Sequence, residues 1–184
     1  MKMTRIVLAV VLLLGAGTAF AADHAFFSAG LGYLRPADSG YTDIYGSQVF
    51  YPEFEAGVRL IRGLYVVGGF GTFTKNGQTP DLHLAAKSTQ SFLTAGLAYL
   101  APISGKVGVK FEAGAADVRY KEESMGTSVS GSKLGFEAGL GLMLMGKVGL
   151  AGLNVGYLTA SGMVGDVKIK LGGARVSLSL GVRI

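Results

Sequence analysis

Residues 133 to 145 read KLGFEAGLGLMLM, and this stretch decides the fold. Its outer apolar residues stand at every second position from Leu134 to Leu144, separated by Gly, Glu or Met. A repeat of two is the strand period, because successive side chains of a strand point to opposite faces of a sheet. The stretch therefore predicts a β-strand with one wholly apolar face.

The same alternation recurs in seven further segments of the chain. They are Phe26 to Leu34, Tyr51 to Ile61, Leu64 to Thr74, Gln90 to Leu100, Lys106 to Tyr120, Lys147 to Leu158 and Val167 to Ile184. Within Leu64 to Thr74, the run Val66-Val67-Gly68-Gly69 fits either phase, so the register of this segment stays open. We expect about eight strands.

The connections between these segments alternate between long and short. Four are long and polar: Arg35 to Phe50, Lys75 to Thr89, Lys121 to Ser132 and Thr159 to Asp166. Three are short: Arg62-Gly63, Ala101 to Gly105 and Gly146. Transmembrane barrels show this alternation, with long loops outside the cell and short turns in the periplasm. The sequence predicts an all-β fold, a transmembrane up-and-down antiparallel β-barrel.

The composition agrees with an apolar solvent and a non-helical chain. The mean hydropathy is +0.44, only 16% of the residues are charged, and 30 of the 184 are Gly. Soluble domains carry about 25% charged residues, and Gly disfavours helices. Hydrocarbon offers no partner to a backbone N–H or C=O, so a sheet in a membrane must close on itself. The scattered basic residues form no nucleic-acid-binding stretch.

The first residues predict export. Lys2 and Arg5 precede the apolar run Ile6 to Gly17, and Ala19-Phe20-Ala21 follows with small residues at the positions that a signal peptidase reads. An apolar run of about twelve residues is too short for a membrane helix, which needs about 20. We expect a signal peptide over residues 1–21 and a barrel domain over residues 22–184.

A membrane helix over Val148 to Gly165 is the main competing interpretation. This segment has no charge and contains Gly152 and Gly156 at the spacing of a helix-pairing motif. Its alternation of apolar residues and its several Gly favour a strand instead. A soluble two-sheet sandwich would also alternate, but its outer faces would be polar.

If the apolar faces meet lipid, the charged and polar residues within the strands point into the barrel. The expected interior set is Glu55, Arg59, Lys110, Glu112, Lys133, Glu137, Asn154, Arg175 and Arg183. The lumen of an eight-stranded barrel is only wide enough to be filled by side chains. We therefore expect a salt-bridged plug in which bases outnumber acids, with a narrow ion path or a catalytic cluster as alternatives.

The signal peptide, the eight alternating segments, the interior Glu, Arg and Lys residues and the terminal segment Gly172 to Ile184 carry a resemblance. The chain resembles the small outer-membrane β-barrel domain family of the OmpA and OmpX kind. The resemblance implies a monomer in the bacterial outer membrane, surrounded by lipid and lipopolysaccharide and inserted by the barrel-assembly machinery. Of the family's C-terminal assembly signal, Ser177 and Val182 match loosely, whereas Ser179 and Ile184 depart from it. Without Trp, the aromatic girdle falls to Phe residues and to Tyr33, Tyr65, Tyr99 and Tyr157.

Catalytic and metal-binding patterns are weak. The chain has no Cys and only two His, which are not spaced as metal ligands. The only triad-like grouping is His83 with Asp81 and Ser88, in a segment expected to be a loop. We expect no enzymatic activity, no cofactor and no metal.

Binding through the outer loops is the remaining route to function. Tyr41, Tyr45 and Tyr51 gather in the first long connection, where exposed aromatics can contact a partner. The sequence favours a structural or surface-interaction role resembling adhesion. A small pore or, less favoured, a lipid A modifying enzyme are the alternatives.

Overall fold

The computed structural model describes residues 24–80, 82–164 and 167–184. The expected signal peptide and its cleavage site lie outside these residues. The elements are β1 (Ala25–Pro36), α2 (Ser39–Tyr45), β2 (Val49–Ile61), β3 (Leu64–Gln78), β4 (Ala85–Ser104), β5 (Val107–Ser124), β6 (Thr127–Met145), β7 (Gly149–Val164) and β8 (Val167–Arg183).

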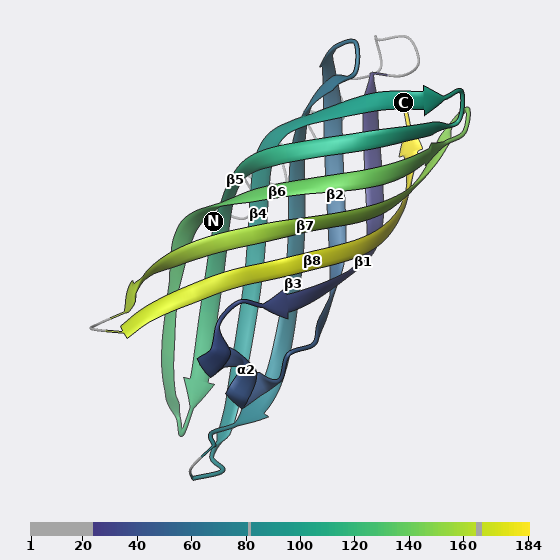
Figure 1. The fold of residues 1–184 in the computed structure, drawn as a ribbon. Helices are drawn as coiled ribbons and strands as arrows, with labels where there is room; N and C mark the ends of the chain where they lie inside the picture. Colours follow the sequence, from purple (N-terminus) through teal and green to yellow (C-terminus); the bar gives the residue numbers. More distant parts are fainter. Residues whose placement is uncertain (1–23, 81, 165–166) are drawn as a thin grey trace.

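The eight strands form one closed antiparallel barrel in sequence order (Figure 1). Each strand pairs with its neighbours in the chain, and β1 closes the ring against β8, with Leu31 opposite Leu178. Closure leaves no free edge inside the bilayer, as the expected membrane location requires. The predicted up-and-down transmembrane barrel is confirmed.

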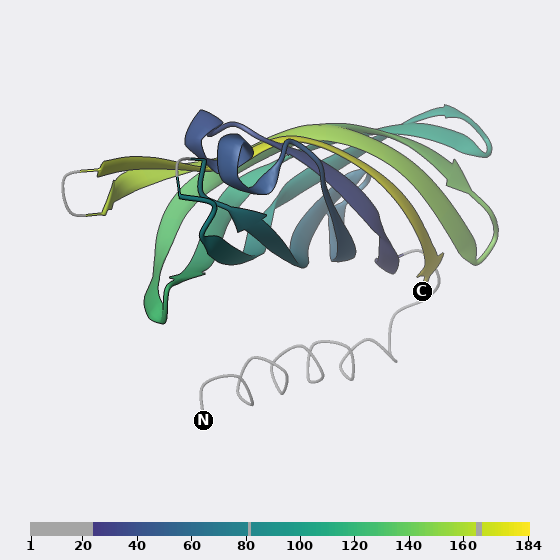
Figure 2. The ribbon, with the colours of Figure 1, turned by 90° about the horizontal axis from the view of Figure 1, so that it is seen from below.

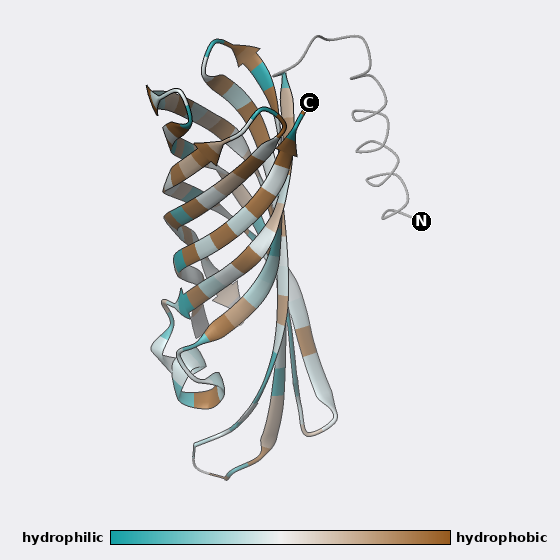
Figure 3. Cartoon of the chain, turned by 90° about the vertical axis from the view of Figure 1, so that its right-hand side faces the viewer, coloured by the Kyte–Doolittle hydropathy of each residue, from teal (hydrophilic) through white to brown (hydrophobic). Residues whose placement is uncertain are grey.

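The outer face of the barrel is an apolar belt, visible in Figure 3 as alternating brown and pale bands along the strands. Its exposed members include Leu31, Phe54, Leu97, Phe111, Leu134, Phe136, Leu140, Leu153, Leu178 and Leu180. Leu134 is 81% exposed and Phe136 72% exposed, which would be costly in water and is favourable in hydrocarbon. The outward faces predicted from the period of two are confirmed.

The register of β3, which the sequence leaves open, is settled by its neighbours. Val66 and Phe70 face outward, 45% and 42% exposed, whereas Val67 is buried inside the barrel. Tyr65 shares the inward phase and packs edge-on against Phe26, with ring centroids 5.6 Å apart. Tyr65 therefore does not belong to the outer aromatic girdle, contrary to expectation.

Three of the four expected long loops are mostly strand. β3 continues to Gln78 and β4 begins at Ala85. β5 and β6 are joined by a turn at 125–126. β7 continues to Val164 and β8 begins at Val167. Strand pairing is made by backbone groups, which polar residues supply as apolar ones do, and Thr is itself a good strand former. The change to polar residues therefore marks the membrane boundary and not the end of the strands.

These extensions project beyond the belt as arms, which splay apart (Figures 1 and 2). We call the end of the barrel with α2 and the arms the arm end. The opposite end is the turn end, formed by the three short connections at residues 62–63, 105–106 and 146–148. In transmembrane barrels the longer connections generally face outside and the short turns face the periplasm, which is the orientation that we expect for the arm end and the turn end.

The wall divides at the arm end between β6 and β7. Their pairing stops at Gly135 opposite Ala160, so residues 127–134 of β6 pair with β5 alone. The ammonium group of Lys133 crosses the gap and donates a hydrogen bond to the carbonyl oxygen of Met163, 2.9 Å away. β6 thus has an open strand edge at the arm end.

The β7–β8 arm leaves the barrel at two glycines with positive φ, Gly172 at 90° and Gly173 at 151°. A Cβ atom on Gly173 would lie 1.9 Å from the carbonyl oxygen of Arg35 in β1. Only Gly allows both this backbone conformation and this close approach. The paired length of β1 and β8 ends at this point, Pro36 opposite Gly173.

The competing helix over Val148 to Gly165 is wrong, because residues 149–164 form β7. Among the described residues, no helix is long and apolar enough to cross a membrane.

Candidate functional site

The middle of the barrel interior holds a buried ionic triad. The ammonium group of Lys110 on β5 lies 2.7 Å from a carboxylate oxygen of Glu55 on β2 and 2.8 Å from one of Glu112. The three side chains are only 5%, 12% and 13% exposed. Buried charges are stable only when paired and hydrogen-bonded, and this geometry satisfies the ammonium group from two sides.

A second ion pair lies close to the triad. Arg175 on β8 donates a 2.7 Å hydrogen bond to Glu137 on β6, and both side chains are less than a tenth exposed. The guanidinium carbon also stands 5.6 Å from the ring centre of Phe92, within the range of a cation–π contact. Arg175 is thus held on one side by charge and on another by an aromatic face.

A further acid, Glu53, joins this middle layer. It shares the inward phase of β2 with Tyr51 and Glu55, and one of its carboxylate oxygens is buried without a hydrogen-bond partner in the described part of the chain. Asn154 is also inside, 3.5 Å from the Ser177 hydroxyl. The layer holds four carboxylates, those of Glu53, Glu55, Glu112 and Glu137, against two bases, Lys110 and Arg175. Acids therefore outnumber bases within this layer, whereas bases outnumber acids in the whole expected interior set.

The other three members of the expected interior set lie away from this layer. Arg59 is near the turn end, where its guanidinium group lies 3.2 Å from the imidazole of His24. Arg183 is also at the turn end and lies 3.4 Å from the carbonyl oxygen of Gly146. Lys133 spans the gap between β6 and β7 at the arm end. The sequence pattern gave their inward phase but not their height along the barrel.

Apolar side chains fill the interior above and below the charged layer. The larger cluster lies toward the arm end and consists of Leu34, Val49, Tyr51, Phe73, Phe92, Ala116, Val118, Tyr120, Leu158, Ala160 and Leu171. The smaller cluster, toward the turn end, comprises Tyr65, Val67 and Ala98, with Phe26 and Leu100 packed against it. A cavity of about 30 Å³ beside it is large enough for little more than a water molecule.

Inward glycines make room for the largest interior rings. A Cβ atom on Gly32 would lie 2.2 Å from the ring of Tyr51, and one on Gly71 would lie 2.3 Å from the ring of Phe92. The two rings also pack edge to face, with centroids 5.0 Å apart. Flat Gly surfaces on the wall therefore allow two aromatic side chains to lie across a narrow lumen.

Helix α2 is fastened to the arm end by a hydrogen-bonded carboxylate. Tyr45 donates to one oxygen of Glu122 at 2.5 Å, and Ser88 donates to the other at 2.6 Å. Asp38 caps the helix by accepting from the backbone N–H of Tyr41 at 3.1 Å, and its second oxygen accepts from the N–H of Lys170 on β8. The helix is thereby tied to β4, β5 and β8.

Tyr45 is buried and Tyr41 half-buried at this contact, and their rings lie 4.7 Å apart. Burial raises the pKa of Tyr41 to about 12. Burial raises the pKa of Tyr45 well above its ordinary value, and the hydrogen bond to the negatively charged Glu122 raises it further. Both phenols stay protonated through the physiological range.

The three tyrosines expected to contact a partner are not exposed. Tyr51 lies inside the barrel and is 1% exposed, because it belongs to β2 and not to a loop. Tyr45 is 8% exposed and is held by Glu122, and the hydroxyl of Tyr41 is buried. Their aromatic surface stabilises α2 and the barrel interior instead of facing solvent.

His83 does not form a catalytic arrangement with Ser88. Ser88 is fully buried and donates its hydrogen bond to Glu122, whereas His83 is exposed and lines an open groove between α2 and the β3–β4 arm. Asp81 lies outside the described residues. Within the described residues, no cluster of His, Asp or Glu is arranged to hold a metal ion.

Known proteins resemble this chain in structure and not in sequence. No family model matches the chain. No curated protein matches it in sequence. Solved structures match over almost the whole chain. The outer membrane protein OprG of Pseudomonas aeruginosa superposes with a TM-score of 0.66 at 16% identity, covering 89% of this chain and 97% of that one. This chain has the fold of a small outer-membrane barrel.

Two further outer-membrane barrels support this assignment. Neisserial surface protein A matches with a TM-score of 0.59 at 16% identity, over 90% of this chain and 99% of that one. Ail, the attachment invasion locus protein of Yersinia pestis, in complex with the heparin analogue sucrose octasulfate, matches with a TM-score of 0.58 at 19% identity, over 89% and 100%. The outer-membrane localisation and the architecture that the sequence resemblance implied agree with these neighbours.

Proposed function

We propose that this outer-membrane barrel is closed to ions and binds an extended protein segment at the cell surface, along the free edge of β6. The observation that carries the proposal is the stretch Thr127 to Leu134, which pairs with β5 on one side only and, before Leu134, stands beyond the apolar belt. Insertion by the barrel-assembly machinery, contact with lipopolysaccharide and a monomeric state belong to the same proposal.

An edge strand offers a row of free N–H and C=O groups to which another strand can add. Residues 127 to 134 read TSVSGSKL, which includes strand-forming Thr and Val and no Pro. Residues 127–130 are exposed, so a partner strand can approach. Proteins that avoid such pairing place charges or Pro on the edge, and here the single charge, Lys133, is engaged by the Met163 carbonyl at one end.

The interior supports a closed barrel more than a pore. Two apolar clusters lie on either side of the charged layer, and its ion pairs join strands that are not neighbours in the wall, β2 with β5 and β6 with β8. A conducting path would have to break these pairs or wet the apolar clusters, and both changes cost free energy. We also propose that the chain is not an enzyme, since Ser88, the serine of the triad-like grouping with His83, is engaged by Glu122.

The name of one similar protein points to attachment. Ail, one of the similar structures, is named the attachment invasion locus protein, and its complex contains a heparin analogue. That name describes Ail. For the present chain it supports a surface-binding role over a purely structural one.

The test uses the purified barrel in detergent and a phage-displayed library of random decapeptides. We expect the wild-type barrel to enrich extended peptides. Ser128→Lys places a charge on the free edge, and its cross-strand neighbour Glu123 accommodates the new cation. The selected peptides should lose about fivefold in affinity, the worth of one main-chain hydrogen bond.

Ala85→Lys is the matched control, because Ala85 is exposed on β4, a strand flanked by β3 and β5. It should leave peptide binding unchanged. Equal loss in both variants, or no enrichment over an unrelated barrel, would refute binding at the β6 edge. Steady single-channel conductance of the wild-type protein in planar bilayers would refute the closed interior.

A further inference from the structure

Each of the three short turns at the turn end carries one basic residue beside an exposed aliphatic side chain. Arg62 follows Ile61, which is 66% exposed, and Lys147 precedes Val148, which is 63% exposed. The third turn carries Lys106, three positions after Ile103, which is 67% exposed. The three bases are exposed as well. The pattern therefore repeats at every connection on this side of the barrel.

The turn end is also free of acidic residues in the part of the chain that the structure describes. Of the described carboxylates, those of Glu53, Glu55, Glu112 and Glu137 lie in the barrel interior, and those of Asp38, Asp43, Asp117, Glu122 and Glu123 lie toward the arm end. Arg59 and Arg183 add two more bases to the turn end. The side-chain charges of the described residues at this end are thus all positive.

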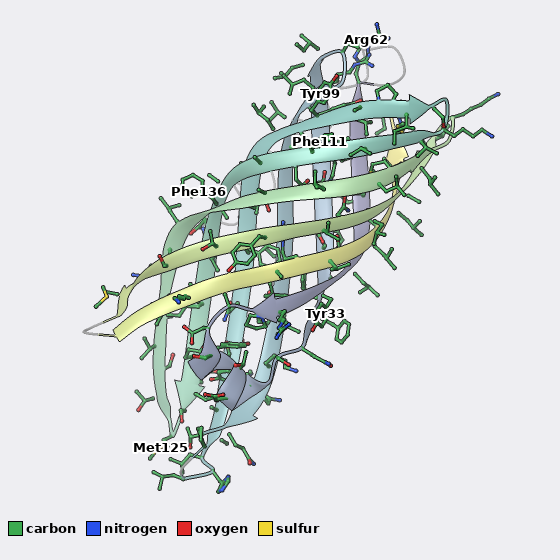
Figure 4. All side chains as sticks on the ribbon, viewed as in Figure 1. Tyr33, Arg62, Tyr99, Phe111, Met125 and Phe136 are labelled. Carbon is green, nitrogen blue, oxygen red and sulfur yellow. The ribbon has the colours of Figure 1, made fainter. Side chains whose placement is uncertain are left out.

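The three turn bases make no ion pair with a described residue. Three exposed bases of the arm end differ, because Lys87 and Lys121 both contact Glu123, and Arg119 lies 2.9 Å from Asp117. Figure 4 shows Arg62 at the end of the barrel opposite Met125, which marks the tip of an arm. The positive charge of the turns therefore has no counterpart within the described barrel.

We propose that Arg62, Lys106 and Lys147 form a rim that binds the phosphate groups of anionic phospholipids in the leaflet facing the turn end. The inference depends on the barrel fold and is independent of the β6 edge. Long basic side chains lie along apolar surface while their charged heads reach the interface. The apolar belt continues to the level of these bases through Ile61, Ile103 and Val148. One lipid can therefore contact the aliphatic residue of a turn with its acyl chain and the base of the same turn with its phosphate.

A phospholipid fits this rim better than a soluble anion or a cell-wall polymer. The aliphatic partner at each turn would remain exposed to water if the ligand were purely polar, whereas a lipid covers it with hydrocarbon. Attraction of a base to an anionic lipid surface corresponds to about a fivefold preference per residue and falls with salt. The three bases lie on three separate turns, so the rim can contact several lipids at once.

The test uses the absence of Trp from the chain. Val148→Trp places a single fluorophore on the rim, and the protein is refolded into phosphatidylcholine vesicles that contain either dibrominated phosphatidylglycerol or dibrominated phosphatidylcholine at equal fractions. Bromine quenches Trp on contact, so the ratio of quenching reports the lipid preference at this turn. The heat-dependent gel mobility of each variant reports that the barrel is folded.

We expect the barrel to show severalfold stronger quenching by the anionic lipid at low salt. The preference should vanish in the triple variant Arg62→Gln, Lys106→Gln and Lys147→Gln. It should persist in the control Lys87→Gln with Lys121→Gln, which removes two bases from the arm end. Equal quenching by both lipids, or a preference that survives in the triple variant, would overturn the proposal.

A cell-wall polymer is distinguished by sedimentation. Co-sedimentation of the detergent-solubilised barrel with purified peptidoglycan that needs the three bases, together with no lipid preference in vesicles, would assign the rim to that polymer. It would overturn the phospholipid proposal and leave the β6 edge unaffected.

Discussion

Removing the ammonium group of Lys110 should destabilise the barrel more than any single change on its surface. Lys110→Met keeps the length of the side chain but leaves the Glu55 and Glu112 carboxylates without their shared partner, which now lies 2.7 and 2.8 Å from them. Breaking a buried pair by removing one partner costs about 3–5 kcal/mol. Two carboxylates depend on Lys110, so we expect a loss at the upper end of that range.

The free energy of unfolding is measured by guanidinium titration of the barrel refolded in phosphatidylcholine vesicles, followed by circular dichroism. Arg119→Met is the matched control, because Arg119 pairs with Asp117 on the outer surface and its side chain is 62% exposed. Exposed pairs contribute less than about 1 kcal/mol. The two variants thus remove the same kind of charge from a buried and from an exposed pair.

The combined variant Lys110→Met, Glu55→Gln and Glu112→Gln tests whether the cost of Lys110→Met comes from leaving two buried carboxylates unpaired. Replacing a complete buried set with neutral residues costs far less than breaking it, so most of the loss should be recovered. A loss below about 1 kcal/mol for Lys110→Met, or no recovery in the combined variant, would refute the argument that the triad is a mutually dependent buried set.

Three further predictions concern the arm end. Gly173→Ala should destabilise the barrel by about 1–3 kcal/mol in the same titration, because its Cβ atom would collide with β1, whereas Gly105→Ala, with open space around it, should be neutral. Asp38→Ala should cost about 1 kcal/mol through the lost helix cap and speed proteolysis of the first connection, and an unchanged cleavage rate would contradict the role of the cap. Raising the pH above about 10 should weaken the packing of α2, because the phenols of the unfolded segment ionise there while the raised pKa values of Tyr41 and Tyr45 keep the folded phenols protonated. Absorbance at 295 nm should show these two phenols ionising later than ordinary tyrosines. Proteolysis should show α2 released from the barrel at lower pH than the barrel itself unfolds.

The strands and their outward faces were predictable because lipid imposes a strict period of two. The run from Leu134 to Leu144 alternates without a break, and the structure places these residues on the outer face. β3 was ambiguous, because Val66 and Val67 are equally apolar, and only pairing with β2 and β4 settles its phase. In a closed sheet each strand pairs on both sides, and this pairing determines its register and so which of its residues face inward.

Contacts across the lumen could not be predicted. Lys110 and Glu55 lie on strands separated by two others, and their height along the barrel depends on the stagger of all the strands between them. Glu53 was missed because it stands near the start of β2, next to a polar segment expected to be a loop. The polar arms were missed for a related reason, since residues such as Ser128 and Ser130 form strands as readily as loops.

The sequence contains one signal of the short helix α2. Asp38 precedes Ser39, where the helix begins, and Asp is a favoured helix cap. The helix itself has only seven residues, too few to show an apolar period. Its burial of Tyr41 and Tyr45 depends on Glu122 and Ser88 of other strands, so their exposure could not be judged from the first connection alone.

The imbalance of charge in the middle layer fixes the sign of any ion that could cross the barrel. Four carboxylates surround two bases there, so the lumen is a well of negative potential between two low-dielectric rings of apolar side chains. An anion entering from either end meets repulsion at this layer, whereas a small cation meets attraction. A variant in which the apolar side chains on either side of this layer are replaced by small ones should therefore conduct potassium in preference to chloride. Its reversal potential in a salt gradient should show this cation selectivity.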